Sequence, residues 1–315
     1  MRKISDYLTI TLKGIAMGAA DVVPGVSGGT IAFISGIYEE LLSSIKSINA
    51  TTIKLLLTFK FQQFWERING NFLFALVLGI GISIFSLAKL MTWLLVNEPI
   101  ATWSFFFGLI IASSLMVSRD VSKWNIASII SLIAGVVLSY TITVISPAST
   151  PNTWWFIILS GAIAICAMIL PGISGSFILL LLGKYAFIMD AVSNFRINII
   201  ALFGLGAIVG IVSFSHFLSW LLEKYRNTTI ALLTGVMIGS LNKVWPWKRV
   251  VETYVDSHGE TKPLLESNIL PSTYESINGI DPHLWQAILF CIVGFVLIYT
   301  VELIGNKVRK QREQK

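Results

Sequence analysis

The chain has 315 residues, of which 55% are hydrophobic and only 13% are charged, and its mean hydropathy is +0.76. A soluble globular core does not need that much apolar sequence, so the composition predicts an integral membrane protein. The net charge of +6 does not indicate a nucleic-acid partner, because the basic residues lie in short loops and a C-terminal tail. That distribution is typical of membrane orientation.

The first apolar segment is interrupted in its middle. Residues 19–38 read AADVVPGVSGGTIAFISGIY, with an aspartate, a proline and four glycines among apolar residues. Proline lacks a backbone donor and glycine permits a positive φ, so we expect one helix to stop at Pro24 and another to begin at about Ser27. Asp21 and the Pro-Gly break stand where a signal peptide would carry its cleavage site, so we expect the N-terminus to be retained.

Three uninterrupted apolar spans follow, at residues 71–96, 101–118 and 124–145. Each approaches or exceeds the roughly 20 residues that cross a bilayer core as a helix. A second interrupted segment, AMILPGISGSFILLLLGKY at 167–185, repeats the first almost letter for letter, and here we expect a helix to restart at about Ser174. Further apolar runs at 197–222 and 284–304 lie on either side of the polar loop 242–283.

These similarities indicate an internal duplication. At an offset of 147, Gly14, Pro24, Gly25, Ser27, Gly28, Gly36 and Tyr38 fall on Gly161, Pro171, Gly172, Ser174, Gly175, Gly183 and Tyr185. At an offset of 127, SLAKLMTWLL (86–95) falls on SFSHFLSWLL (213–222), and Gly79 and Gly108 fall on Gly206 and Gly235. At an offset of 159, GVVLSYT (135–141) falls on GFVLIYT (294–300). The blocks keep their order, so we predict two repeats, residues 1–150 and 151–315.

Each repeat contains two helical segments separated by a Pro-Gly interruption, which we call the broken pair. About three uninterrupted spans follow it. If the broken pair is re-entrant, each repeat crosses the membrane an odd number of times and the second is inverted relative to the first. We therefore expect an all-α, polytopic membrane fold built as an inverted repeat, each half a re-entrant broken hairpin plus about three transmembrane helices. The connections 97–100 and 146–153 hold no Lys or Arg, which places them outside by the positive-inside rule. Both termini, including the basic tail, are then cytoplasmic at the inner membrane, and the loop 242–283 is extracytoplasmic.

The two interruptions are the candidate binding site. Unpaired backbone groups at membrane depth are tolerated only when buried in protein or lining a wet cavity. A helix that starts near the midplane points its free N–H groups and positive dipole end into the protein, which suits a carboxylate or phosphate. The candidate residues at the two tips are Pro24, Gly25, Ser27, Gly28, Gly29, Thr30, Pro171, Gly172, Ser174, Gly175 and Ser176.

Three further polar residues within apolar stretches are candidates. Asp21, whose repeat equivalent is Met168, is either a proton- or cation-coupling group or a helix cap, and the sequence leaves both open. Lys89 and His216 are repeat equivalents and are either paired anion contacts or snorkelling residues near the ends of their spans. The two cysteines lie in apolar segments and no Cys/His cluster has metal-ligand spacing, so we expect neither a disulfide framework, a metal site nor a cofactor.

The motifs GxxMGxADVVPGVSGGT (14–30) and LPGISGSFILLLLGKY (170–185) resemble those of the bacterial and archaeal polyprenyl-phosphate transporters, over nearly the whole chain. The resemblance implies transport of undecaprenyl phosphate, the carrier lipid of cell-wall glycans, from the outer to the inner leaflet for reuse. It also implies re-entrant hairpins in inverted repeats, with the tip residues and Asp21 as the site. The loop 242–283 is the part that least resembles the family.

Two other classes of function compete with this one. Paired helix tips bind a water-soluble carboxylate or inorganic anion equally well, so a transporter of small anions is the alternative. A membrane enzyme such as a lipid phosphatase is not expected, because its chemistry needs clustered catalytic side chains and the chain has three histidines, at 216, 258 and 283. The sequence leaves the coupling ion and a homo-oligomeric state open.

Overall fold

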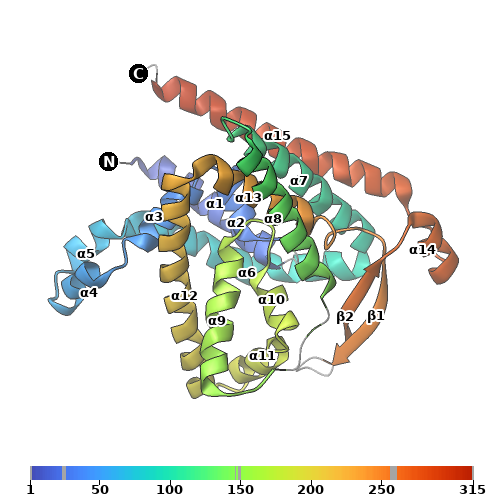
Figure 1. The fold of residues 1–315 in the computed structure, drawn as a ribbon, viewed down its shortest axis with the longest axis horizontal. Helices are drawn as coiled ribbons and strands as arrows, with labels where there is room; N and C mark the ends of the chain where they lie inside the picture. The colour runs from blue at the N-terminus through green and yellow to red at the C-terminus, as the bar shows by residue number, and fades with distance from the viewer. Residues whose placement is uncertain (1, 23–25, 146, 148–149, 256–260, 314–315) are drawn as a thin grey trace.

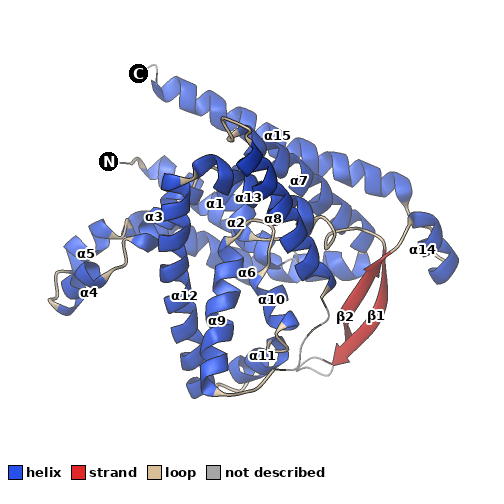
Figure 2. Ribbon diagram, viewed as in Figure 1, coloured by secondary structure: helices blue, strands red, loops and turns tan. Residues whose placement is uncertain are grey.

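The computed structural model describes residues 2–22, 26–145, 147, 150–255 and 261–313, and these are mostly helical (Figures 1 and 2). The helices within residues 1–150 are α1 (Ile4–Val22), α2 (Gly28–Ile34), α3 (Tyr38–Lys46), α4 (Ala50–Leu57), α5 (Phe61–Arg67), α6 (Gly70–Asn97), α7 (Pro99–Arg119) and α8 (Ile126–Val144). Those within residues 151–315 are α9 (Trp154–Ile169), α10 (Gly175–Leu181), α11 (Tyr185–Ser193), α12 (Ile197–Lys224), α13 (Arg226–Ser240), α14 (Pro271–Asn278) and α15 (Leu284–Glu313).

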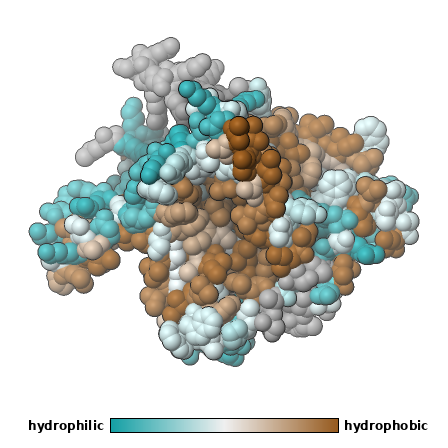
Figure 3. All heavy atoms as spheres, in the orientation of Figure 1, coloured by the Kyte–Doolittle hydropathy of each residue, from teal (hydrophilic) through white to brown (hydrophobic). Residues whose placement is uncertain are grey.

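Four helices in the described ranges are long and apolar enough to cross a membrane: α6, α7, α8 and α12. They coincide with spans expected from the sequence. Helices α10 and α11 together would make a fifth span, but they are bent by 112° at their junction. On the face drawn in Figure 3, hydrophobic residues cover the central helices, and the projection formed by α4 and α5 is hydrophilic on its upper side and hydrophobic on its underside. The chain is therefore a mostly helical, multi-pass membrane protein.

The helices pack in pairs that run parallel. Along α1 and α6, Gly14 faces Leu76 and Gly18 faces Ile80, and along α9 and α12, Ile158 faces Gly206 and Ala162 faces Gly210. A Cβ on Gly79 or Gly206 would collide with a backbone carbonyl of the partner helix. Small residues bring membrane helices into such close contact because helix association there depends on packing.

The other two pairs each join a helix of residues 1–150 to a helix of residues 151–315. Helix α7 packs along α15, and α8 packs along α13. Gly108 of α7 lies against the backbone of Cys291, and Gly235 of α13 lies against the backbone of Leu132. Gly108 and Gly235 are the residues that the 127-residue offset matches. Matched glycines thus occupy matched contacts.

The tight turns between consecutive long helices also correspond. Glu98 joins α6 to α7 with φ −131° and ψ 53°, and Tyr225 joins α12 to α13 with φ −130° and ψ 47°. The Thr102 hydroxyl donates to the Glu98 carbonyl at 2.7 Å, and the Thr229 hydroxyl donates to the Tyr225 carbonyl at 2.9 Å. The two turns therefore resemble each other down to an individual hydrogen bond.

The segment 242–283 differs from the polar loop expected there. It contains an antiparallel hairpin of β1 (Lys248–Val255) and β2 (Thr261–Asn268), followed by α14. The sequence KRVVETYV is rich in β-branched and aromatic residues, which is a strand signal that the hydropathy profile hides. The fold among the described residues is thus helical except for this hairpin.

Candidate functional site

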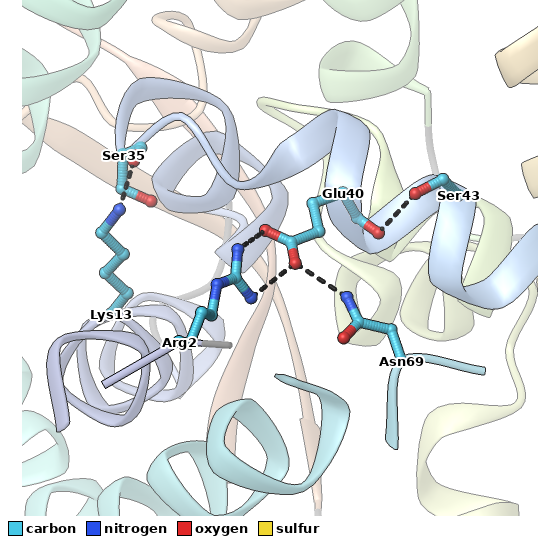
Figure 4. Close-up of polar contacts among 6 residues, drawn as sticks. All are labelled: Arg2, Lys13, Ser35, Glu40, Ser43 and Asn69. Carbon is cyan, nitrogen blue, oxygen red and sulfur yellow. Dashed lines mark hydrogen bonds and ion pairs between the residues drawn. The ribbon is translucent and has the colours of Figure 1, made fainter. Parts of the chain in front are cut away.

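The first broken pair returns to the end of the molecule from which it started. The Arg2 guanidinium donates twice to the Glu40 carboxylate at 2.6 Å, and the Asn69 amide donates to the same carboxylate at 2.8 Å (Figure 4). Lys13 donates to the carbonyl of Ser35, at the C-terminal end of α2, at 2.6 Å. After α1 and α2, the chain is therefore back beside the start of α1.

The second broken pair returns in the same way. The buried Lys184 ammonium, at the end of α10, donates to the Thr150 carbonyl at 2.8 Å and to the Asn152 side-chain oxygen at 2.5 Å. Thr150 and Asn152 immediately precede α9. This lysine ties the end of α10 to the start of α9.

At the first tip, Asp21 and Ser27 cap the N-terminus of α2. The Gly28 N–H donates to the Asp21 carboxylate at 2.6 Å, and the Gly29 N–H donates to the Ser27 hydroxyl at 3.0 Å. A Cβ on Gly28 would lie 2.5 Å from the carboxylate, so only glycine lets Asp21 approach. Of the two roles left open for Asp21, the geometry is that of a cap, and it puts a negative charge where the helix favours an anion.

The second tip has different chemistry. Gly172 has φ +88°, a conformation that side chains disfavour, and it directs the chain from the buried Pro171 toward α10. Ser174 is the N-cap residue but makes no side-chain cap bond, and its hydroxyl instead pairs with that of Ser176 at 2.8 Å. A Cβ on Gly175 would lie 2.6 Å from the Ala164 carbonyl oxygen. This tip has hydroxyls at its helix start and no carboxylate.

The two tips are in direct contact. The Ser27 hydroxyl donates to the Met168 carbonyl at 2.9 Å, and the Gly172 N–H donates to the Thr30 hydroxyl at 2.9 Å. The Tyr38 hydroxyl adds a third bond, to the Ile169 carbonyl at 3.1 Å. Ser27, Thr30 and Tyr38 are almost completely buried. Residues about 140 positions apart thus form one polar cluster inside the protein.

Sequence reasoning found part of this cluster. Pro24 and Gly25 lie outside the described residues. Gly29 is at the interface, where a Cβ would collide with the Ile169 carbonyl oxygen. Tyr38 was noted from the sequence only as a repeat match to Tyr185, and that match is the signal that could have identified it. Among the described residues, no group of three or more His, Cys, Asp or Glu side chains is placed to hold a metal ion.

Lys89 and His216 are not brought into the cluster by any contact in the described part of the chain. Lys89 is exposed on α6, and His216 is half-buried on α12 with its Nδ1 2.8 Å from the carbonyl oxygen of Val212. Because Gly18 faces Ile80 and Ser83 along parallel helices, Lys89 lies about one helical turn beyond the end of α1. It is therefore near the depth of the first tip, and no contact joins it to the described residues of that tip.

Comparison with known proteins supports the family resemblance that the two motifs indicate. A family model described as undecaprenyl phosphate translocase-like (VCA0040-like) matches residues 17–262, which include both tips. The chain belongs to this family. A polyprenyl-phosphate transporter of Vibrio cholerae serotype O1 is 48% identical over 306 residues, covering 97% of this chain and 99% of the relative. A polyprenyl-phosphate transporter of Staphylococcus aureus is 34% identical over 253 residues, covering 75% of this chain and 85% of the relative. No solved structure matches significantly.

Proposed function

We propose that this protein transports polyprenyl phosphate, and specifically undecaprenyl phosphate, across the cytoplasmic membrane so that the carrier lipid is reused in cell-envelope glycan synthesis. The 48% identity over almost the whole chain to a relative named polyprenyl-phosphate transporter carries the substrate assignment. The contact between the two tips supports a binding site at the centre of the protein. An unaccompanied phosphate would meet a large desolvation cost there, and helix starts with nearby hydroxyls reduce it.

We infer that the phosphate binds between the tips, among Ser27, Thr30, Ser174 and Ser176. Within the part of the chain that the structure describes, the hydroxyls of Ser174 and Ser176 pair only with each other, so rotation of either makes a donor accessible. At the first tip the Asp21 carboxylate competes with the phosphate for the Gly28 N–H. Protonation of Asp21 weakens that competition, which couples phosphate binding to proton uptake.

We further propose that the architecture is an inverted repeat with two re-entrant hairpins. Its support is the correspondence of packing: α1 with α6 matches α9 with α12, and α7 with α15 matches α13 with α8. Each hairpin returns to its own side, at Glu40 beside Arg2 and at Lys184 beside Thr150. Three further helices per repeat then give an odd number of crossings, and inversion provides two related conformations, each open to one face.

The orientation follows from the distribution of basic residues, with both termini in the cytoplasm. In a variant lacking Cys166 and Cys291, a single cysteine at the exposed Asn97 is expected to react with an impermeant thiol reagent added outside intact cells. A cysteine at the exposed Lys123, on the opposite side, is expected to react only after permeabilisation. The reverse pattern would contradict this orientation.

The transport proposal is tested with purified protein in liposomes and a short-chain polyprenyl phosphate placed in one leaflet. We expect the protein to move it to the other leaflet, and we expect a polyprenol without phosphate and inorganic phosphate to compete poorly. If inorganic phosphate or a small carboxylate competes equally and no lipid changes leaflet, the protein is a transporter of small soluble anions instead.

A further inference from the structure

A cavity of about 330 Å³ lies beside the second tip, between the end of α8, helix α10 and the β-hairpin. Its polar lining includes Tyr140 and Thr143 of α8, and Lys243, Lys248 and Glu266 of the segment after α13. Apolar side chains, Val144, Ile145 and Leu181 among them, form the rest of the wall. The cavity thus combines charged and apolar surfaces.

Two lysines of the cavity share a single carboxylate. The Lys243 ammonium lies 3.1 Å from Glu266 Oε2, and the Lys248 ammonium lies 3.6 Å from the same oxygen. The Lys248 side chain is only 7% exposed, and its Nζ has no hydrogen-bond partner among the described residues. It lies 3.6 Å from the centroid of the Trp103 ring, which compensates only part of the hydration it has lost.

Burying an ammonium in this way destabilises the fold unless an anion pairs with it. Burial, together with the smaller effect of the neighbouring Lys243, lowers the pKa of Lys248 to about 7, although Glu266 acts in the opposite direction. The two lysines hold the pKa of Glu266 below its usual range, so this carboxylate stays ionised. With both lysines charged, the cluster carries one uncompensated positive charge and one ammonium without a hydrogen bond.

We propose that this cavity binds a phosphate monoester through Lys243 and Lys248, and that it receives the lipid headgroup on its way to the tips. The inference rests on the transport function proposed above. A phosphate monoester supplies the missing negative charge and several acceptor oxygens, while the apolar wall accommodates the first part of a hydrocarbon tail. Glu266 keeps the site from holding the phosphate too tightly.

The cavity is connected to the second tip through two short links. Phe177 of α10 lines the cavity, and the Lys243 ammonium lies 4.8 Å from the centroid of its ring. On the other side, Ser240 at the end of α13 packs against Gly172, where a Cβ would lie 3.0 Å from the Ser240 hydroxyl. Only a few residues therefore separate the cavity from the helix start at the tip.

This site has no equivalent in the first repeat. There the connection from α7 to α8 is only residues 120–125, whereas the matching connection from α13 to α15 contains the hairpin and α14. In the orientation proposed above, the hairpin faces the outside. The cavity thus makes the two faces of an otherwise repeated architecture unequal, as capture of the lipid from the outer leaflet requires.

The test measures equilibrium binding of a short-chain polyprenyl phosphate to the full-length protein in detergent, at constant ionic strength. We expect Lys243→Gln and Lys248→Gln each to weaken binding about ten- to hundredfold, the effect of losing one hydrogen bond to a charged group. Glu266→Gln is expected to tighten binding, because it removes the competing carboxylate. Arg249→Gln, an exposed neighbour on β1, is the matched control and is expected to leave binding unchanged.

Thermal unfolding of each variant separates loss of binding from loss of folding, and the opposite sign expected for Glu266→Gln cannot arise from misfolding. Inorganic phosphate as competitor distinguishes the sources: weak competition assigns the site to a lipid headgroup, and equal competition assigns it to free phosphate. Folded lysine variants that bind like the wild type would overturn the proposal. If the wild type moves no lipid in liposomes, the transport function fails instead, whatever these variants bind.

Discussion

Replacing Gly172 by valine is expected to abolish transport while the protein still inserts into the membrane. Gly172 has φ +88°, and a Cβ there would lie 3.0 Å from both Met237 Cα and the Ser240 hydroxyl. The left-handed conformation costs an ordinary residue roughly 1–2 kcal/mol, and overpacking adds about 1–3 kcal/mol. Together these are enough to displace the tip and break the bond from the Gly172 N–H to Thr30. Transport in liposomes is expected to fall about a hundredfold or more.

Gly279→Val is the matched control for the Gly172 variant. Gly279 also has a positive φ, of +63°, but nothing lies within 4 Å of the position its Cβ would take. It ends α14, outside the tips. We expect this variant to lose some stability and to transport at close to the wild-type rate. Normal transport by Gly172→Val would mean that the tip is a structural turn and not part of the site.

Two substitutions of Asp21 are expected to separate capping from coupling. Asp21→Ala leaves the buried Gly28 N–H without its acceptor, which costs roughly 1–3 kcal/mol and is expected to slow transport about ten- to hundredfold. Asp21→Asn keeps an oxygen that accepts this bond but cannot take up a proton. Because a neutral side chain competes less with the phosphate for the Gly28 N–H, we expect Asp21→Asn to bind polyprenyl phosphate at least as tightly as the wild type and to transport it without responding to a pH gradient.

The control for this pair is Asp190→Asn. Asp190 lies on α11 and pairs with Arg196 at 2.9 Å, so the variant loses a carboxylate outside the tips. Its transport is expected to keep the response to the pH gradient. An Asp21→Asn protein that kept the same response would refute the coupling role and leave Asp21 as a cap alone.

The sequence predicted local features of the site better than its contacts. Pro171 and Gly172 interrupt a helix because of their own backbone chemistry, and Ser27 caps the next helix because its hydroxyl reaches an N–H two residues ahead. The bond from Ser27 to Met168 joins residues 141 positions apart, and no local rule specifies it. Such contacts depend on how whole helices pack.

The repeat also led to one expectation that the contacts do not support. Lys89 and His216 match at equivalent positions, but equivalence fixes only the depth of a side chain along its helix and not the direction in which it points. The sequence also did not predict the charged cavity at Lys248. Its residues lie in the segment without a repeat partner, where the comparison of the halves carries no information.

The pairing of α8 with α13 and of α7 with α15 has a consequence for biosynthesis. When the ribosome has completed residue 150, two long helices of the first half still lack the neighbours against which their glycines pack. Those neighbours are made only at residues 226–240 and 284–313. Until then, the surfaces of α7 and α8 that carry Gly108 and Gly135 lack their packing partners in the bilayer. The first half therefore reaches its final packing only after the last helix of the chain has been synthesised.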